Sequence, residues 1–309
     1  MKNIALEILA FFLATNLAAQ QIHSLPDLEK PHQVVVDGAD LYIFDEADYS
    51  LHVYALSPFG RKLTFGRKGD GPQDFKYLPM VYVQSESLVC TDFSKTLWFS
   101  KDGRFLKAKP YSDFESLSLE AEILLFPVNN NFVLVTADHG KEKRYVALLN
   151  SEYRTIKALY EGPFAWETGA PIPYRTDTVV HDGRIYISDT QKGFHIEVFD
   201  ERGNRLRTID KSRDVEKAPG QPLLHQYGVA EGKIYTTTYA KKDGKTEMIV
   251  LDLDGRILKR IFLPLTSIRP KRGVLRYDLF TVGGGKLYEV VQKGETGKWE
   301  LWITDLETP

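Results

Sequence analysis

Residues 31–75 of this 309-residue chain read PHQVVVDGADLYIFDEADYSLHVYALSPFGRKLTFGRKGDGPQDF. The stretch holds four short runs rich in Val, Ile, Tyr, Phe and Leu, a composition that favours strands over helices. The turn DGAD separates the first two runs, a polar loop separates the next two, and SPFGR precedes the last. Glycine tolerates the positive φ angles that tight hairpins need. The stretch therefore predicts a unit of four antiparallel strands.

The same unit recurs along the chain. Its third strand can be followed as LHVYA, LWFSK, YVALL, IEVFD, MIVLD and LWITD, whose central residues are Val53, Phe99, Ala147, Val198, Val250 and Ile303. A repeat of roughly 40–50 residues that holds four strands is typical of a β-propeller blade. The count predicts an all-β fold with six blades. No segment keeps the 3.6-residue period of a helical solenoid, and two unrelated β-sandwiches would not explain the fixed order of turn, strand and loop.

Two stretches carry a family resemblance. Residues 31–75 and the stretch VVHDGRIYISDTQKGFHIEVFDERGNRLRTI at residues 179–209 resemble NHL-type repeats. The resemblance is good for blades 1 and 4, fair for blades 2 and 5, and weak for blades 3 and 6. It implies a six-bladed propeller similar to the exported bacterial versions. It implies little about function, because this fold class includes scaffolds, binding proteins, lyases and hydrolases.

The start of the chain, MKNIALEILAFFLATNLAAQQ, has the layout of a secretory signal: a lysine, a mostly apolar run and then small residues. We expect residues 1–20 to be a signal peptide and residues 21–309 to form one propeller domain, exported to the periplasm or the extracellular space. Glu7 within the apolar run leaves an uncleaved membrane anchor as the alternative. No other segment is apolar enough to span a bilayer.

The charge balance bears on the partners. The 40 basic and 42 acidic residues give no overall field that favours nucleic acid. We therefore expect a protein or glycan partner, and a monomer. Cys90 is the single cysteine, so no intramolecular disulfide can form, and its apolar surroundings in SLVCTDF predict a buried core residue.

The glycines of FGRKGDGPQDF, residues 65–75, suggest a phosphate-binding loop. Such a loop needs a helix N-terminus after it, because the helix dipole and its free N–H groups bind the anion. The residues that follow, KYLPMVYVQ, are poor helix formers at their start. The stretch is instead predicted to be the connection between blades 1 and 2, where glycines allow the chain to turn sharply.

The sequence contains no G-x-S-x-G, H-E-x-x-H or paired C-x-x-C motif, so no catalytic residue and no metal ligand is assigned. The seven histidines share no spacing and are expected in turns or on the surface. YEGPFAW, residues 160–166, resembles the Glu-Gly-Pro segment of gluconolactonases and paraoxonases, in which the glutamate binds a central calcium ion. Glu161 departs from that pattern because it follows the third blade instead of opening an early inner strand.

Two predicted connections are longer than a blade junction needs, residues 161–177 and 264–278. Long loops on a rigid scaffold often carry binding residues. The first offers aromatic rings that could stack on a sugar or a peptide, and the second offers basic groups that suit an anion. The candidate ligand-binding residues are Phe164, Trp166, Tyr174, Arg269, Lys271, Arg272 and Arg276. A gap-filling role for the aromatic residues and a solvated rim for the basic ones is the competing interpretation.

Two functions follow from this pattern. The favoured one is an exported, non-catalytic scaffold without a cofactor, which binds a protein or a glycan. The alternative is a calcium-dependent propeller hydrolase or lyase with its site at the axis.

The sixth unit ends at WELWITDLETP, with no residues left for a fourth strand. An unpaired outer edge invites aggregation. The segment near residues 21–25 is extended in character and precedes the first inner strand. We therefore expect it to close the ring by pairing with residues 298–304.

Overall fold

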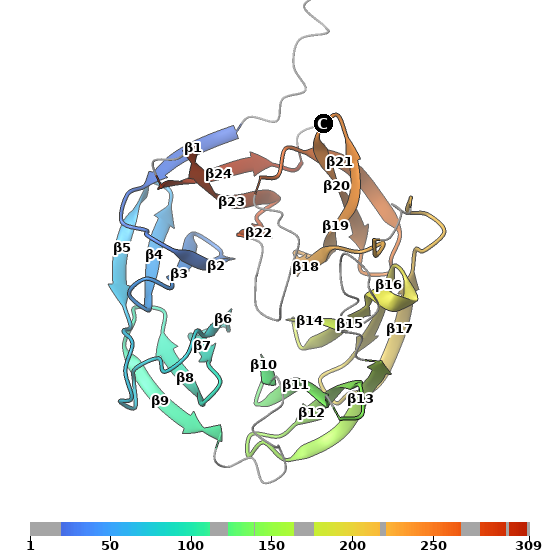
Figure 1. Cartoon of the computed structure of the whole chain (residues 1–309), viewed down its shortest axis with the longest axis horizontal. Coiled ribbons are helices and arrows are strands. Elements are labelled where there is room, and N and C mark those ends of the chain that lie inside the picture. Colours follow the sequence, from blue (N-terminus) through green and yellow to red (C-terminus); the bar gives the residue numbers. More distant parts are fainter. Residues whose placement is uncertain are drawn as a thin grey trace, which may run out of the picture.

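The computed structural model describes residues 20–111, 123–138, 140–163, 176–216, 221–266, 279–294 and 297–307. It contains six sheets of four antiparallel strands, arranged as blades around a central axis (Figure 1). One short 3-10 helix, η2 (Thr190–Lys192), interrupts the strands of the described chain. The prediction of a six-bladed propeller is confirmed.

The first three blades follow each other from the inner to the outer strand. Blade 1 consists of β2 (Pro31–Asp37), β3 (Asp40–Asp45), β4 (Ser50–Leu56) and β5 (Phe59–Phe65). Blade 2 consists of β6 (Met80–Val83), β7 (Ser87–Thr91), β8 (Lys95–Ser100) and β9 (Phe105–Pro110). Blade 3 consists of β10 (Ile123–Val128), β11 (Asn131–Asp138), β12 (Lys143–Leu149) and β13 (Thr155–Pro163).

The other three blades repeat this order, with one substitution in the last. Blade 4 consists of β14 (Thr176–His181), β15 (Arg184–Asp189), β16 (His195–Phe199) and β17 (Arg205–Asp210). Blade 5 consists of β18 (Gln226–Ala230), β19 (Lys233–Lys242), β20 (Lys245–Asp252) and β21 (Ile257–Leu263). Blade 6 consists of β22 (Phe280–Gly283), β23 (Lys286–Lys293), β24 (Lys298–Asp305) and the N-terminal strand β1 (Gln20–Leu25).

The strand β1 closes the ring as expected. It pairs antiparallel with β24, from Gln20 opposite Thr304 to Leu25 opposite Trp299. Leu25 is fully buried, and the Trp299 indole N–H donates to the Glu29 carbonyl oxygen at 3.1 Å. Figure 1 shows β1, at the blue end of the chain, beside the red strand β24. Backbone pairing and apolar burial together join the two ends of the described chain.

Clusters of buried apolar side chains fill the spaces between neighbouring blades. The cluster between blades 4 and 5, for example, joins Val198 and Ile209 to Ile234 and Ile249. Cys90 lies in the cluster between blades 1 and 2 and is fully buried, as predicted. Burial raises the pKa of its thiol, so the thiol stays protonated. The apolar core therefore consists of clusters between neighbouring blades, and the inner strands surround the axis.

The second hairpin of blades 2–5 uses one turn geometry with different residues. Gly103, Gly203 and Gly255 take φ angles of 84°, 74° and 85°, and each donates its N–H to the residue three positions earlier. Tyr153 occupies the same place in blade 3 with φ of 62°. Its ring is buried, and its hydroxyl lies 2.9 Å from Thr96 Oγ1 of blade 2. A tyrosine therefore accepts the strain that glycine avoids and gains a contact between blades.

Residues 66–79 connect β5 to β6, which confirms an inter-blade loop in place of a phosphate-binding loop. The Asp74 carboxylate accepts hydrogen bonds from Arg67 Nε at 2.8 Å and from the Gly71 N–H at 3.2 Å. Phe75 is fully buried in the cluster between blades 1 and 2. The polar residues of the loop bind one another, and its aromatic residue anchors it.

Candidate functional site: the axial cavity

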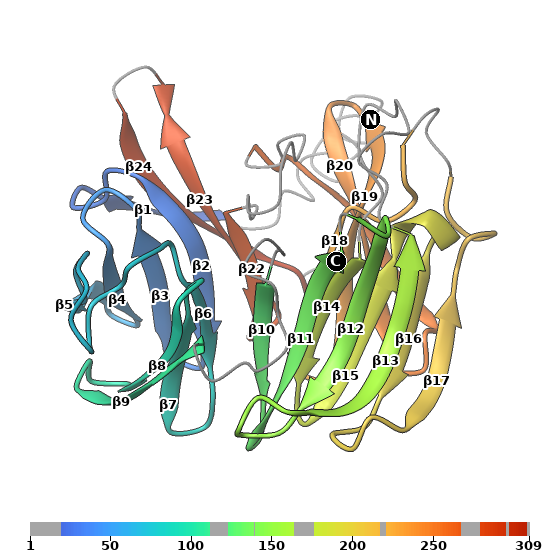
Figure 2. The same cartoon turned by 60° about the horizontal axis from the view of Figure 1, so that its bottom comes forward.

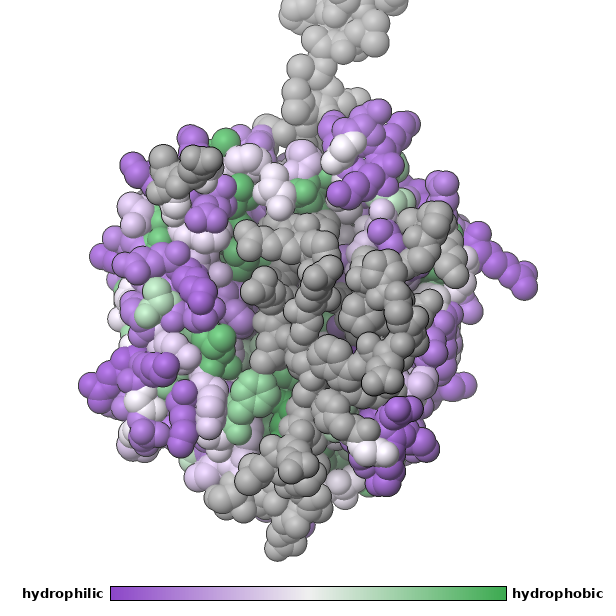
Figure 3. Space-filling view, viewed as in Figure 1, coloured by the Kyte–Doolittle hydropathy of each residue, from purple (hydrophilic) through white to green (hydrophobic). Residues whose placement is uncertain are grey.

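The six inner strands surround a cavity of about 1160 Å³ on the propeller axis. Pockets that bind small molecules typically measure about 300–1,000 Å³. Each inner strand begins at the end of the ring where the chain arrives from the preceding blade, and ends at a tight hairpin turn. Figure 2 shows the hairpins β19–β20 and β23–β24 reaching beyond the first of these ends. Figure 3 shows hydrophilic side chains around the circumference of the face seen in Figure 1.

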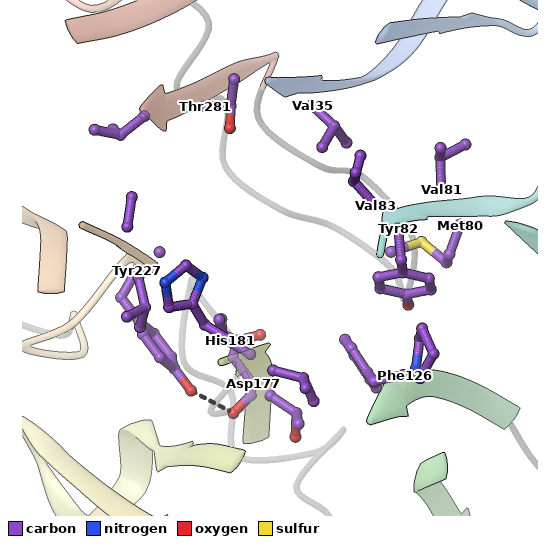
Figure 4. Close-up of a pocket in the computed structure, with 18 of the residues that line it drawn as sticks. Val35, Met80, Val81, Tyr82, Val83, Phe126, Asp177, His181, Tyr227 and Thr281 are labelled. Atoms are coloured by element: carbon purple, nitrogen blue, oxygen red, sulfur yellow. Dashed lines mark hydrogen bonds between the residues drawn. The ribbon is translucent and has the colours of Figure 1, made fainter. Parts of the chain in front are cut away.

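Apolar side chains of blades 1–3 form one part of the lining. Val35 comes from β2, Met80, Tyr82 and Val83 come from β6, and Phe126 comes from β10. The rings of Tyr82 and Phe126 lie 5.4 Å apart between centroids, so they form a continuous aromatic surface across two blades. Figure 4 shows these residues together on one side of the cavity.

Polar groups gather on the inner strands of blades 4–6. Figure 4 places Asp177, His181, Tyr227 and Thr281 on the side of the cavity away from Met80. The Tyr227 hydroxyl lies 2.8 Å from the Tyr186 carbonyl oxygen and 3.1 Å from that of Asp177. Burial raises the pKa of Tyr227 well above its usual value, so the hydroxyl remains a neutral donor that joins blades 4 and 5.

Other polar residues of blades 1–3 also line the cavity. Asp37, Gln84, Asn129 and Asn130 belong to the hairpin turns or the residues beside them, while Thr136 and Arg144 come from the second and third strands of blade 3. Blade 1 also contributes Gln33. Its amide nitrogen donates to the Val81 carbonyl at 2.9 Å, and its amide oxygen accepts the Val81 N–H at 2.7 Å.

Buried carboxylates near the inner strands hold the backbone. Asp45, at the end of β3, accepts the Glu29 N–H at 2.7 Å and the Lys30 N–H at 3.0 Å. Asp92, after β7, does the same for Lys76 at 3.0 Å and for Lys95 at 2.9 Å. The bonds from Glu29, Lys30 and Lys76 tie the chain that leads into an inner strand to the end of the second strand of the same blade, and the bond from Lys95 holds the turn into the third strand. Charge-assisted bonds of this kind satisfy the carboxylates structurally.

A second pair of buried carboxylates plays a similar part. Asp189, which ends β15, accepts the Gln191 N–H at 2.9 Å and the Tyr160 hydroxyl. Glu289, on β23, accepts the Thr266 N–H at 2.7 Å. Within the described ranges, no three His, Cys, Asp or Glu side chains gather in a way that could hold a metal ion.

The candidate residues from the two long connections, Phe164, Trp166, Tyr174, Arg269, Lys271, Arg272 and Arg276, lie outside the described residues. The first connection is shorter than predicted, because β13 extends to Pro163 and β14 begins at Thr176. Glu161 lies on β13, the outer strand of blade 3, and pairs with Lys143. An outer-strand position separates this glutamate from the axis.

The expectation that all histidines occupy turns or the surface is wrong for two of them. His52, on β4, is buried with Ser50 Oγ 2.9 Å from its Nε2. His225, before β18, is fully buried against Tyr239, with ring centroids 4.7 Å apart. Both are packed between strands, where an imidazole ring fills space and meets hydroxyl groups.

Sequence reasoning missed the cavity residues themselves. Each lies on the short run that precedes the first turn cluster of a repeat, such as MVYV before SES or TDTVVH before DG. These runs could have been recognised as inner strands once the repeat was aligned. Their alternating pattern alone does not identify which side chains meet on the axis.

No family model matches the chain, and no curated protein matches it in sequence. Solved structures share its fold. A member of the DUF4221 family from Bacteroides vulgatus has a TM-score of 0.58 at 12% identity, over 94% of this chain and 96% of its own. A predicted exported protein from Bacteroides fragilis has a TM-score of 0.56 at 14% identity, and a luciferin-regenerating enzyme has 0.55 at 11%, both with the same coverage.

At these identities the similarity shows the propeller fold alone. The structures that share it include an enzyme and a predicted exported protein, so function must be argued from the side chains of this chain. In the described part of the chain, no helix has the length and apolar character that crossing a membrane requires.

Proposed function

We propose that this chain is an exported, non-catalytic propeller that binds a glycan or protein partner at the face where its two long connections emerge. The resemblance of blades 1 and 4 to NHL-type repeats and the signal-like residues 1–20 support export. The similarity of the fold to that of a predicted exported protein also supports export. Periplasmic and extracellular locations are both compatible with the proposal.

One observation carries the proposal. Residues 164–175 join β13 to β14, and residues 267–278 lead from β21 toward β22, so both arrive at the start of an inner strand. Thr176 and Phe280, which begin those strands, line the axial cavity. The described strands that follow the two connections therefore both begin at the same end of the cavity. Aromatic rings suit the apolar face of a sugar, and arginine suits a carboxylate or sulfate group.

The buried carboxylates favour binding over hydrolysis. Asp45, Asp92 and Asp189 accept backbone or tyrosine hydrogen bonds, and they hold strands together instead of facing a substrate. Glu161 is on an outer strand. The calcium-dependent hydrolase of the gluconolactonase type would need other ligands.

The test is an array of neutral and acidic glycans probed with the exported chain. We expect Phe164→Ala/Trp166→Ala/Tyr174→Ala to lose binding generally, and Arg269→Ala/Lys271→Ala/Arg272→Ala to lose acidic glycans selectively, because each set removes one kind of contact. The matched control is Arg104→Ala/Arg202→Ala/Arg256→Ala. These exposed arginines lie in the hairpin turns at the opposite end of the ring.

Equal binding by the basic variant and the parent would remove the anionic part of the proposal. Calcium-dependent hydrolysis of a lactone or ester by the purified parent would overturn the non-catalytic function altogether.

A further inference from the structure

The axial cavity is lined unevenly (Figure 4). Blades 4–6 contribute apolar residues such as Val179, Val229 and Val282 as well as polar ones. Val35, Met80, Tyr82, Val83 and Phe126 make the wall on blades 1–3. The Tyr82 hydroxyl oxygen is buried, so what this wall offers a ligand is aliphatic groups, a thioether and ring surface. Such surfaces bind apolar groups by excluding water from both partners.

One polar group close to this apolar wall is already engaged. The Gln33 amide uses its nitrogen and its oxygen on the backbone of Val81, the residue between Met80 and Tyr82. These two bonds satisfy the Val81 N–H and carbonyl groups on the edge of β6, which would otherwise lack a partner there. At Val81 the wall of blades 1–2 therefore has its backbone N–H and carbonyl groups paired.

The opposite wall carries hydrogen-bonding side chains within reach of the cavity. Thr281, on β22, and His181, at the end of β14, are partly exposed there. Figure 4 shows the His181 ring projecting inward. Both side chains can donate to or accept from a hydroxyl or carbonyl group of a ligand, with His181 Nε2 also 3.3 Å from an Asp182 carboxylate oxygen. The hydroxyl of Tyr227, in contrast, is used by two carbonyl groups.

We infer that the axial cavity binds a lipophilic small molecule with one polar end, its apolar body against blades 1–3 and its polar end toward Thr281 and His181. The volume, about 1160 Å³, is sufficient for such a molecule. A free sugar fits this site poorly, because its hydroxyl groups would lose water against Val35, Val83 and Phe126 without replacement hydrogen bonds. The site is separate from the glycan- or protein-binding face proposed above.

The experiment titrates the mature chain with three probes and follows binding by calorimetry and probe fluorescence. 2-Naphthol has an apolar body and one hydroxyl group, 2-methylnaphthalene replaces that hydroxyl with a methyl group, and methyl α-glucopyranoside represents a sugar. We expect one 2-naphthol per chain, weaker binding of 2-methylnaphthalene, and no saturable binding of the glucoside.

Two variants locate the probe. Val83→Phe places an aromatic ring in the space of the cavity and should weaken the binding of 2-naphthol by at least about tenfold. Ile156→Phe is the control, because Ile156 is half exposed on the outer strand β13. Thr281→Val/His181→Leu should weaken 2-naphthol by about three- to tenfold and change 2-methylnaphthalene much less, since it replaces hydrogen-bonding groups with apolar groups of similar size. Thr208→Val, on exposed β17, is the control for that change.

Absence of saturable naphthol binding to the folded parent overturns the inference. So does unchanged binding by Val83→Phe, or tighter binding of the glucoside than of 2-naphthol. If Val83→Phe does not fold, the comparison of 2-naphthol with 2-methylnaphthalene on the Thr281→Val/His181→Leu variant decides instead, and equal losses for the two probes contradict the assigned polar end. Glycan-array results for the loop variants are independent of these outcomes.

Discussion

Two junctions of the ring are built differently. Between blades 4 and 5 the chain runs on from β17 to β18, and Ile209 packs where a Cβ on Gly255 would lie, 2.7 Å away. Between blades 6 and 1 the N-terminal strand β1 belongs to the sheet of blade 6 and leads directly into β2 of blade 1. The first junction depends on close packing of consecutive blades, and the second depends on pairing between distant parts of the chain.

The closing junction has additional contacts of its own. The His23 ring stacks on Phe59 with centroids 4.1 Å apart, and Arg61 Nη1 lies 3.2 Å from an Asp27 carboxylate oxygen. Leu25 and Leu28 are buried in the cluster between these blades. The comparison indicates that the N-terminal segment supplies both an outer strand and part of the core at the seam.

The largest effect is expected from loss of that segment. A chain that begins at residue 29 lacks β1, Leu25 and Leu28, and burial of the two leucines alone contributes about 1.5–3 kcal/mol each. We expect unfolding in urea at a markedly lower midpoint. Within the full segment, Leu25→Ala should cost about 2–5 kcal/mol. Ile22→Ala, at a side chain that is 52% exposed, should change stability by less than about 0.5 kcal/mol.

Equal stability of the truncated and complete chains would show that the seam does not depend on β1. Equal losses for Leu25→Ala and Ile22→Ala would show that backbone pairing, and not core burial, provides its strength.

We expect the junction between blades 4 and 5 to be sensitive to one added methyl group. Gly255→Ala imposes a positive φ angle on alanine, which costs about 1–2 kcal/mol, and also presses a Cβ against Ile209. Gly244→Ala is the matched control, because Gly244 has a similar φ of 75° and no atom within 4 Å of the added Cβ. The difference between their free energies of unfolding measures the packing at the junction alone. A difference of zero would mean that blade 5 moves away from Ile209 without cost.

The smallest expected effect is the loss of folding stability at acidic pH. Burial is the main cause that lowers the pKa of His52, against the opposing influence of Asp48 and Asp45, while Arg61 lowers it further. The folded chain then binds fewer protons at this ring than the unfolded chain does. Stability is therefore complete above pH 6.5, the ordinary histidine value, and falls as the pH drops toward the lower folded-state value.

The measurement is the urea midpoint of the parent and of His52→Gln between pH 5 and 8, where the variant should show a flatter dependence. His32, whose pKa burial also lowers, accounts for a remaining slope in the variant. Identical slopes in the two proteins would remove His52 from the acid response.

The blade count, the strand order and the closing strand could all be predicted from the sequence. Four apolar runs with turns between them specify a hairpin unit locally, and the missing last strand of the sixth unit leaves only the N-terminal segment to pair with β24. Local turn chemistry also identified residues 65–75 as part of an inter-blade connection, which the structure extends to residues 66–79. Each of these features depends on residues close together in the sequence, or on a strand that is missing from one repeat.

The residues that line the axis could not be predicted, because they depend on how the blades pack together. Met80, Phe126 and His181 lie in three different repeats, and their meeting depends on the curvature that six packed sheets impose. The same packing buried His52 and His225, which local sequence placed in turns or on the surface. It also assigned Asp45 and Asp92 to backbone hydrogen bonds across a blade. Alternation along a strand gives two faces, but closure of the ring selects the face that meets the cavity.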